Sequence, residues 1–350
     1  MTAPGAEARG DYGGLLHAVE SCFAAGDYVR AEQVVGAALA TDPHNPRLLT
    51  AFARAKLGQS DWAAAASSAH AALSAEPQNE HTMRVYTRAL EMQGRWQEAL
   101  WMAAHTAATH PFSYQAHYGH ARLLHACARP GEAMAAVNEA LRLNPSDVDS
   151  LVLRGDMFGT LGQYGAAEAD YRQALLINPQ HADAVHSLAM LAHARGKRWN
   201  AVRGFLAVGQ LDPLYGDVVR QNVGAVITGV LRRSAWVVLI AGFGVILTFT
   251  LHEDGRPTAI PRIVAGIGAV ALIVMAARIM REVPTRTLGA VLKKRQILAI
   301  RIVQLAAGAV FGTVTALFGA MTVPAVLASV LVLSLPIVVI VGGLTGERLW

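Results

Sequence analysis

The feature that most constrains this chain is a proline that returns every 34 residues. Six prolines keep this spacing without a slip, at Pro43, Pro77, Pro111, Pro145, Pro179 and Pro213. Six alanines keep the same interval, at Ala31, Ala65, Ala99, Ala133, Ala167 and Ala201. A period of this length is typical of stacked helical units, because one such unit cannot bury its own apolar face whereas several stacked units can.

Each unit has the pattern of two short amphipathic helices. In the first unit Leu15, Ala18 and Cys22 share one face of a helix, and a Gly-Asp-Tyr turn at residues 26–28 separates it from the next. The small side chain of Ala31 lets the two helices approach closely. The proline ends the second helix, because its ring cannot continue the helical hydrogen bonding.

This combination of period, packing alanine and helix-ending proline resembles the tetratricopeptide repeat family. The resemblance implies an all-α fold, an α-solenoid of six helix-turn-helix repeats at residues 12–45, 46–79, 80–113, 114–147, 148–181 and 182–215. The fourth and sixth repeats depart from the pattern at residues 128–131 and at Arg198, and we expect local distortion there without a break in the array. Residues 1–11 are expected to be disordered, and they carry no secretory signal peptide.

The C-terminal part differs in both charge and hydropathy. Residues 1–221 contain 18 Lys+Arg and 21 Asp+Glu, whereas residues 222–350 contain 12 and 4. After a helix at 216–233, which we expect to cap the solenoid, four apolar stretches are about long enough to cross a bilayer. We therefore predict a transmembrane bundle of about four helices, at 234–251, 263–280, 302–321 and 323–344, followed by a cytoplasmic tail at 345–350.

The loop between the second and third predicted spans carries most of the basic residues, namely Arg281, Arg286, Lys293, Lys294 and Arg295. The positive-inside rule places this loop, the repeats and both termini in the cytoplasm. The basic excess lies beside apolar stretches, so it predicts contact with a lipid bilayer and no nucleic acid. Arginine far outnumbers lysine, 26 to 4, which with the alanine richness suggests a bacterial gene and hence the plasma membrane.

The same family resemblance implies that the second, fifth, ninth and twelfth residues of each repeat face a concave groove. In repeats two to four the ninth residues are Arg54, Arg88 and Arg122, and Glu20, Asp156 and Met190 hold this position in the other repeats. Nearby groove positions in these middle repeats are held by Arg47, His81, Arg84, Glu91, Tyr118 and His125.

Arginine suits a carboxylate or a phosphate, because its planar guanidinium donates two parallel hydrogen bonds. The hypothesis is that Arg47, Arg54, Arg84, Arg88, Tyr118, Arg122 and His125 bind an acidic peptide or a chain-terminal carboxylate. This resembles the carboxylate clamp of chaperone-binding members of the family, although the asparagines of that clamp have no counterpart here. The alternative is that the arginines are solvated, or pair with acids such as Glu91 and Asp156.

No catalytic, metal or cofactor site is predicted. Cys22 and Cys127 are expected to be small apolar residues, and the histidines at 105, 110, 117, 120 and 125 lack a ligand to complete a metal site. No phosphate-binding loop, Ser/His/Asp set or carboxylate pair is found, so we do not expect an enzyme.

Gly308 and Gly312 form a G-x-x-x-G pattern, which favours close packing of two helices and, as the alternative, a homo-oligomer. Arg278 and Arg301 are expected to snorkel from the span ends. The predicted function is a membrane-anchored adaptor. The alternative is a regulatory or structural subunit of a transporter or channel complex, which the lack of Asp, Glu, Lys and His well inside the spans disfavours.

Overall fold

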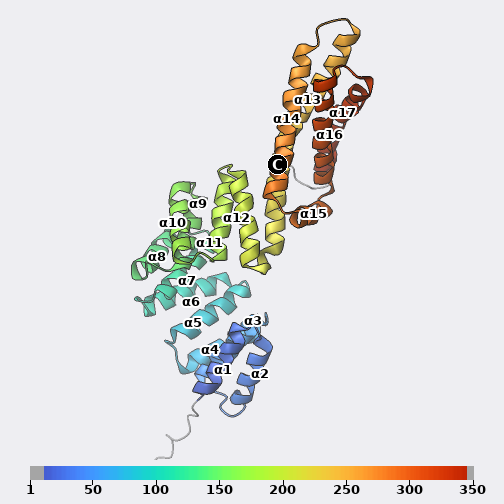
Figure 1. Ribbon diagram of the computed structural model, residues 1–350. Coiled ribbons are helices and arrows are strands. Elements are labelled where there is room, and N and C mark those ends of the chain that lie inside the picture. The colour runs from blue at the N-terminus through green and yellow to red at the C-terminus, as the bar shows by residue number, and fades with distance from the viewer. Residues whose placement is uncertain (1–11, 345–350) are drawn as a thin grey trace, which may run out of the picture. The chain divides into compact units, whose positions relative to one another are not determined.

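The computed structural model describes residues 12–344, so the predicted disordered segment 1–11 and the predicted tail 345–350 lie outside the described residues. Within the described range the chain is all-α, with 17 α-helices, one short 3-10 helix and no strand (Figure 1). The chain divides into two compact units, residues 1–178 and 179–350.

The first unit consists of five helical hairpins in succession, drawn from blue to green in Figure 1. Their helices are α1 (Gly13–Ala24) and α2 (Tyr28–Leu39), α3 (Pro46–Gly58) and α4 (Trp62–Ala75), α5 (Glu80–Met92) and α6 (Trp96–Thr109), α7 (Tyr114–Ala126) and α8 (Pro130–Leu143), and α9 (Val148–Thr160) and α10 (Tyr164–Ile177).

Local signals with the 34-residue period set the ends of these helices. The first helix of repeats two to five is capped by the side chains of Asn45, Asn79, Ser113 and Asp147, each of which accepts a backbone N–H from the first turn. A cap of this kind contributes about 1 kcal/mol. The six period-linked alanines are each 0% exposed, as the predicted close approach of paired helices requires.

The turns inside the hairpins also keep the period, because one residue in each takes a left-handed backbone with φ between 57° and 74°. These residues are Gly26, Ser60, Gly94, Ala128, Gly162 and Gly196. The turn of the fourth repeat keeps this left-handed φ and α8 begins at Pro130, so the array is not broken there. The departure takes the form of a strained backbone at Ala128, where four of the other turns have glycine.

The second unit contains the sixth hairpin and all the long apolar helices. Its elements are α11 (Ala182–Ala194), α12 (Arg198–Leu211), the 3-10 helix η1 (Pro213–Tyr215), α13 (Gly216–Glu253), α14 (Ala259–Glu282), α15 (Thr285–Lys294), α16 (Gln296–Phe318) and α17 (Thr322–Leu344).

The predicted capping helix and the first predicted span are one continuous helix, α13, of 38 residues. No proline interrupts its sequence, and at 1.5 Å per residue it is about 57 Å long, well beyond the thickness of a bilayer core. Its N-terminal half packs on α12, and its C-terminal half packs on α14, α16 and α17. One hydrophobic core therefore runs through the second unit, including Phe205 of α12, Ile227 of α13, Leu272 of α14, Leu298 of α16 and Leu335 of α17.

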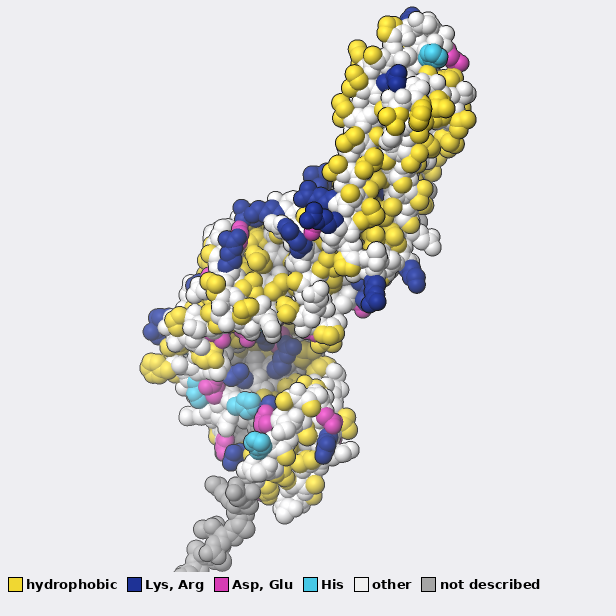
Figure 2. Space-filling model, viewed as in Figure 1, with side chains coloured by type: hydrophobic (Ala, Val, Ile, Leu, Met, Phe, Trp, Pro, Cys, Tyr) yellow, Lys and Arg dark blue, Asp and Glu magenta, His cyan; other side chains and the backbone are white. Residues whose placement is uncertain are grey.

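Three described helices, α13, α14 and α16, are long and apolar enough to cross a membrane, and α17 is apolar over Thr322–Val338. Figure 2 shows apolar side chains, in yellow, covering the visible surface of the helices α13–α17. Helix α14 has 24 residues, so it is longer than the predicted span 263–280. Helix α16 ends at Phe318, where Gly319 takes a φ of 84°.

The G-x-x-x-G pattern of α16 serves packing within the chain. A Cβ added at Gly312 would lie 2.7 Å from the carbonyl oxygen of Ala265 on α14, and one added at Gly308 would lie 3.0 Å from Leu272 and 3.3 Å from Val238. Both glycines are buried. This face is occupied by α13 and α14, which corrects the expectation of a homo-oligomer through these glycines.

Candidate peptide-binding groove

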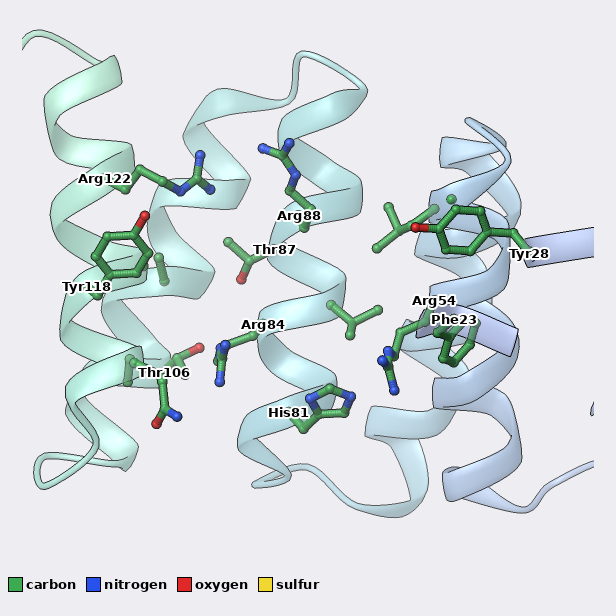
Figure 3. Close-up of a pocket in the computed structure, with 17 residues that line it drawn as sticks. Phe23, Tyr28, Arg54, His81, Arg84, Thr87, Arg88, Thr106, Tyr118 and Arg122 are labelled. Carbon is green, nitrogen blue, oxygen red and sulfur yellow. The ribbon is translucent and has the colours of Figure 1, made fainter. Parts of the chain in front are cut away.

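The first unit contains a cavity of about 610 Å³ between α1, α2, α3, α5, α6 and α7. Figure 2 shows a recess in this unit where basic and histidine side chains gather, and Figure 3 shows the cavity in detail. It is lined by Phe23, Tyr28, Arg54, Leu57, Gly58, His81, Arg84, Val85, Thr87, Arg88, Ala103, Thr106, Gln115, Ala116, Tyr118, Gly119 and Arg122.

Five of the seven predicted groove residues line this one cavity, namely Arg54, Arg84, Arg88, Tyr118 and Arg122. The other two lie outside its lining. Arg47 is exposed in the first turn of α3, where its backbone N–H donates to the Asn45 side chain at 3.1 Å, and His125 is half-buried in the last turn of α7. Both lie in terminal turns of their helices.

Arg54 is held by an acidic residue of the preceding repeat. Its guanidinium donates to both carboxylate oxygens of Glu20, and it also lies over the ring of Phe23 at 4.3 Å. The hydrogen bond from Arg54 lowers the pKa of Glu20 from its usual value of 4.5. The ion pair and the cation–π contact fix this arginine against the wall of the cavity.

Arg88 and Arg122 share the carboxylate of Glu91, the acidic residue noted in the sequence. Arg122 donates to its two oxygens at 2.7 and 2.6 Å, and Arg88 donates at 2.9 Å. Burial of Glu91 would raise its pKa, but the hydrogen bonds from both arginines outweigh that effect and hold the pKa below 4.5. The pairing with Glu91 that the alternative names is therefore present for these two arginines.

Asp156, the other acid named in that alternative, accepts a hydrogen bond at 2.7 Å from Tyr171 and contributes no residue to the cavity lining. Arg84 is held more loosely than the other three arginines. Its Nη1 lies 3.7 Å from a carboxylate oxygen of Glu80, beyond hydrogen-bond distance. Figure 3 shows Arg84, Arg54 and His81 on one side of the cavity and Arg88 and Arg122 on the other.

Desolvation and the charges of Arg54 and Arg84 lower the pKa of His81 below 6.5. The ring is therefore neutral at physiological pH and offers a hydrogen bond in place of a charge. The cavity thus combines four guanidinium groups with the neutral polar side chains of His81, Gln115 and Tyr118.

Some lining residues were not predicted. Phe23 occupies the twelfth position of the first repeat, so the same register could have identified it. Tyr28 and Thr106 come from the second helices of their repeats, α2 and α6, and the groove positions of the first helices give no signal for them.

The histidines do not converge on a metal. Within residues 12–344, no group of three or more His, Cys, Asp and Glu side chains is arranged to hold an ion. Two of the clustered histidines contact backbone carbonyl oxygens instead, His110 that of Gln78 at 2.9 Å and His117 that of Pro111 at 3.0 Å.

Comparison with known proteins identifies the repeats. Tetratricopeptide repeat family models match residues 50–109 and 148–181. Similar solved structures are PilF of Pseudomonas aeruginosa (19% identity, 57% of this chain, 91% of that chain, TM-score 0.48) and a tetratricopeptide repeat protein from Parabacteroides merdae (18%, 62%, 90%, 0.47). PilW, a type IV pilus biogenesis factor, is similar at 23% identity over 47% of this chain and 77% of that chain, with a TM-score of 0.44.

No curated protein matches the chain. The match at 148–181 coincides with the fifth repeat and the match at 50–109 lies within the second and third, and the 34-residue period continues through all six hairpins. Repeats of this kind are in general scaffolds for protein–protein interaction and not enzymes. The chain thus contains tetratricopeptide repeats, matched at residues 50–109 and 148–181, followed by a C-terminal set of long apolar helices.

Proposed function

We propose that this chain is a membrane-anchored scaffold whose groove binds an acidic segment of a partner protein. The observation that carries the proposal is that four arginines line one cavity while no Asp or Glu belongs to its lining. The carboxylates that balance these arginines, Glu20, Glu80 and Glu91, are not among the lining residues. A carboxylate from a ligand can therefore contact guanidinium groups of the lining directly.

The four arginines are not equally available to such a ligand. The side chains of Arg54 and Arg122 are 28% and 31% exposed, and both terminal nitrogens of each donate to a carboxylate. The side chains of Arg84 and Arg88 are more exposed, at 44% and 50%. A ligand carboxylate thus meets Arg84 and Arg88 first. Arg54 and Arg122 keep the cavity wall in place.

The membrane anchor in this proposal consists of four crossings, by α13, α14, α16 and α17. Basic residues are concentrated at the end of the bundle that carries α15, whereas Arg256 and Arg262 at the other end are balanced by Glu253 and Asp254. The positive-inside rule then places the α15 end and the repeats in the cytoplasm. The excess of Arg over Lys and the alanine richness support a bacterial origin, and the proposed site of action is therefore the plasma membrane.

Fluorescence anisotropy with labelled peptides tests the groove. The purified full chain in a neutral detergent is titrated with an acidic peptide, with the same peptide after Asp and Glu are replaced by Asn and Gln, and with an acidic peptide whose C-terminus is amidated. We expect binding of both acidic peptides and a loss of at least tenfold for the neutral one, since a hydrogen bond to a charged group contributes about 1.5–3 kcal/mol. Binding that vanishes on amidation would assign the site to a terminal carboxylate instead.

The variant R84E/R88E should lose at least tenfold in affinity for the acidic peptide. The matched control is R129E/R142E, which makes the same charge change at two exposed arginines on α8 and in the turn before it, outside the cavity. An equal loss in both variants would mean that net charge governs binding. In that case the groove has no specific role and the proposal is wrong.

A further inference from the structure

One arginine inside the bundle is buried without an anion. Arg301 of α16 is 6% exposed, and its Nε is sealed from solvent with no hydrogen-bond partner in the described part of the chain. The sequence had suggested that Arg301 snorkels freely from the end of its span, and the structure shows that it does not. A buried guanidinium without a counter-charge is strongly unfavourable, since its hydration is lost and nothing replaces it.

Within residues 12–344 the chain offers no carboxylate near Arg301. Between residues 223 and 344 the only acidic residues are Glu253, Asp254 and Glu282. The first two lie at the opposite end of α13, and Glu282 lies 3.9 Å from Arg203 of α12. Among residues 12–344, no ion pair is formed by Arg301.

The surroundings of Arg301 add positive charge. Arg232 of α13 is close enough to repel it. Towards the start of α16, Arg295 donates a hydrogen bond to the Thr228 hydroxyl at 3.3 Å. The next polar side chain deeper in the bundle, Gln304, is satisfied by Ser334 of α17 at 2.9 Å. Arg301 is thus an unpaired cation between a satisfied polar pair and a basic rim.

The depth of Arg301 suits a phospholipid headgroup. It lies five residues after Gln296, the first residue of α16, which is about 8 Å along the helix. Of its nitrogens only Nε is both sealed and unpaired, so the terminal nitrogens of the fork reach the surface of the bundle. Guanidinium is weakly hydrated and matches phosphate oxygens bidentately, which makes arginine well suited to such a partly buried contact.

Helix α15 contributes to the same basic end of the bundle. It packs against α13 and α16, with Val291 3% exposed in the shared core, while Arg286 and Lys293 are exposed. Basic pockets between membrane helices on the cytoplasmic side are suited to anionic head groups. Long-range attraction by these exposed charges would bring anionic lipid to the rim but would not by itself fix a phosphate.

We propose that Arg301 is the anchor of a phosphate-binding site between α13 and α16, filled by the headgroup phosphate of an anionic phospholipid. The site lies in the second unit and does not depend on what the groove of the first unit binds. A lipid phosphate and a free phosphate share the same chemistry, so the experiment has to separate these two sources.

The test is thermal unfolding of the full chain in a neutral maltoside detergent with phosphatidylglycerol, phosphatidylcholine or inorganic phosphate added. Phosphatidylglycerol should raise the Tm of the wild type saturably and more than phosphatidylcholine does. For R301L its apparent affinity should fall about tenfold or more, the loss of one bidentate charged contact. The matched control is R281L, which removes an exposed arginine near the same end of the bundle and should change the affinity less than twofold.

A second measurement uses the destabilisation that the unpaired charge of Arg301 causes. Without any anionic lipid, R301L should melt at a higher temperature than the wild type, and R281L at the same temperature. Should R301L fail to fold, R301K retains the charge without the fork and should still weaken phosphatidylglycerol binding several-fold.

Equal losses in R301L and R281L, or no preference for phosphatidylglycerol over phosphatidylcholine, would overturn the proposal. Saturable stabilisation by inorganic phosphate, to the same extent and through Arg301, would support the site and identify free phosphate as its ligand.

Discussion

The repeat array and the apolar helix bundle hold their helices together in the same way but differ in their outward faces. In both, small side chains let helices approach: alanines such as Ala99 and Ala133 in the array, and Gly308 and Gly312 in the bundle. The outward faces differ. The array carries surface ion pairs such as Arg129–Glu132 at 2.6 Å, whereas the bundle exposes Ile, Val and Phe along its length. The packing between helices does not distinguish the two regions, whereas their outward-facing residues do.

The two regions also treat arginine differently. In the array, Arg54 and Arg122 are each paired with a carboxylate, Glu20 and Glu91. In the bundle Arg301 has no such partner. The array therefore balances these two guanidinium groups with its own carboxylates, whereas within residues 12–344 the bundle offers no anion to Arg301.

The largest predicted effect comes from placing a carboxylate on the outward face of each region. V270D places a carboxylate at the middle of α14, on a side chain that is 62% exposed, whereas L176D does so on α10 at 84% exposure. If α14 faces lipid, V270D should cost about 3 kcal/mol of membrane insertion. L176D faces water and should cost less than about 0.5 kcal/mol.

Alkaline extraction of membranes and glycosylation mapping measure insertion, and V270N serves as a neutral control of the same size. Insertion of α14 that V270D leaves unchanged would show that position 270 does not face lipid, and the assignment of α14 as a membrane span would then have to be abandoned.

Much of the fold could be predicted because the decisive signals are local and repeated. The prolines, alanines and caps recur every 34 residues, so a chance match at one position is corrected by five others. The continuity of α13 could not be predicted in this way, since its two halves differ in composition. The packing of α15 and of the sixth hairpin on α13 depends on tertiary contacts that no short sequence pattern specifies.

The candidate site shows the same limit. The repeat register identified Arg54, Arg88 and Arg122 because each holds the same position on its own helix. It could not assign their partners, since the pairs of Arg54 with Glu20 and of Arg122 with Glu91 join different repeats. The register also treats helix ends like helix centres, which is why Arg47 was included although it lies outside the cavity.

A smaller effect is expected from the buried carboxylate of the array. The pKa of Glu91 is held below 4.5 by Arg122 and Arg88, so its stabilising effect is present above about pH 4.5 and is lost as the pH falls through the lowered pKa. The stability advantage of the wild type over E91Q should be about 1.5 kcal/mol at neutral pH, the size of one hydrogen bond to a charged group. It should shrink below about pH 4.5.

Denaturant unfolding of the array, followed by circular dichroism from about pH 7 to pH 3, measures this advantage. E98Q is the matched control, because Glu98 is exposed and paired with Arg95 at 2.5 Å, where solvent screens the pair. An advantage over E91Q that stays constant with pH would mean that Glu91 is held by packing and not by its charge.

The smallest effect concerns the backbone, where the two regions should behave alike. Ala128 has a φ of 57° in the turn before α8, and an L-residue in this conformation costs about 1–2 kcal/mol. A128G should therefore stabilise the fourth hairpin by about 0.5 kcal/mol after the greater entropy of unfolded glycine is subtracted. G94A should destabilise the third hairpin by about 1 kcal/mol, since its φ is 74° and an added Cβ would meet no atom within 4 Å.

Gly255 provides the matching position after α13, with a φ of 67° and equally open space. Hydrogen exchange at the adjoining helix ends measures the free energy of local opening. This free energy should fall by the same amount in G255A as in G94A, because the strain of a left-handed residue depends on the chain and not on the solvent. A much larger fall in this free energy for G255A would mean that the turn at the far end of the bundle depends on contacts that the open space around Gly255 does not account for. An equal fall in both variants would mean that the array and the bundle differ in their outward side chains and not in their backbone turns.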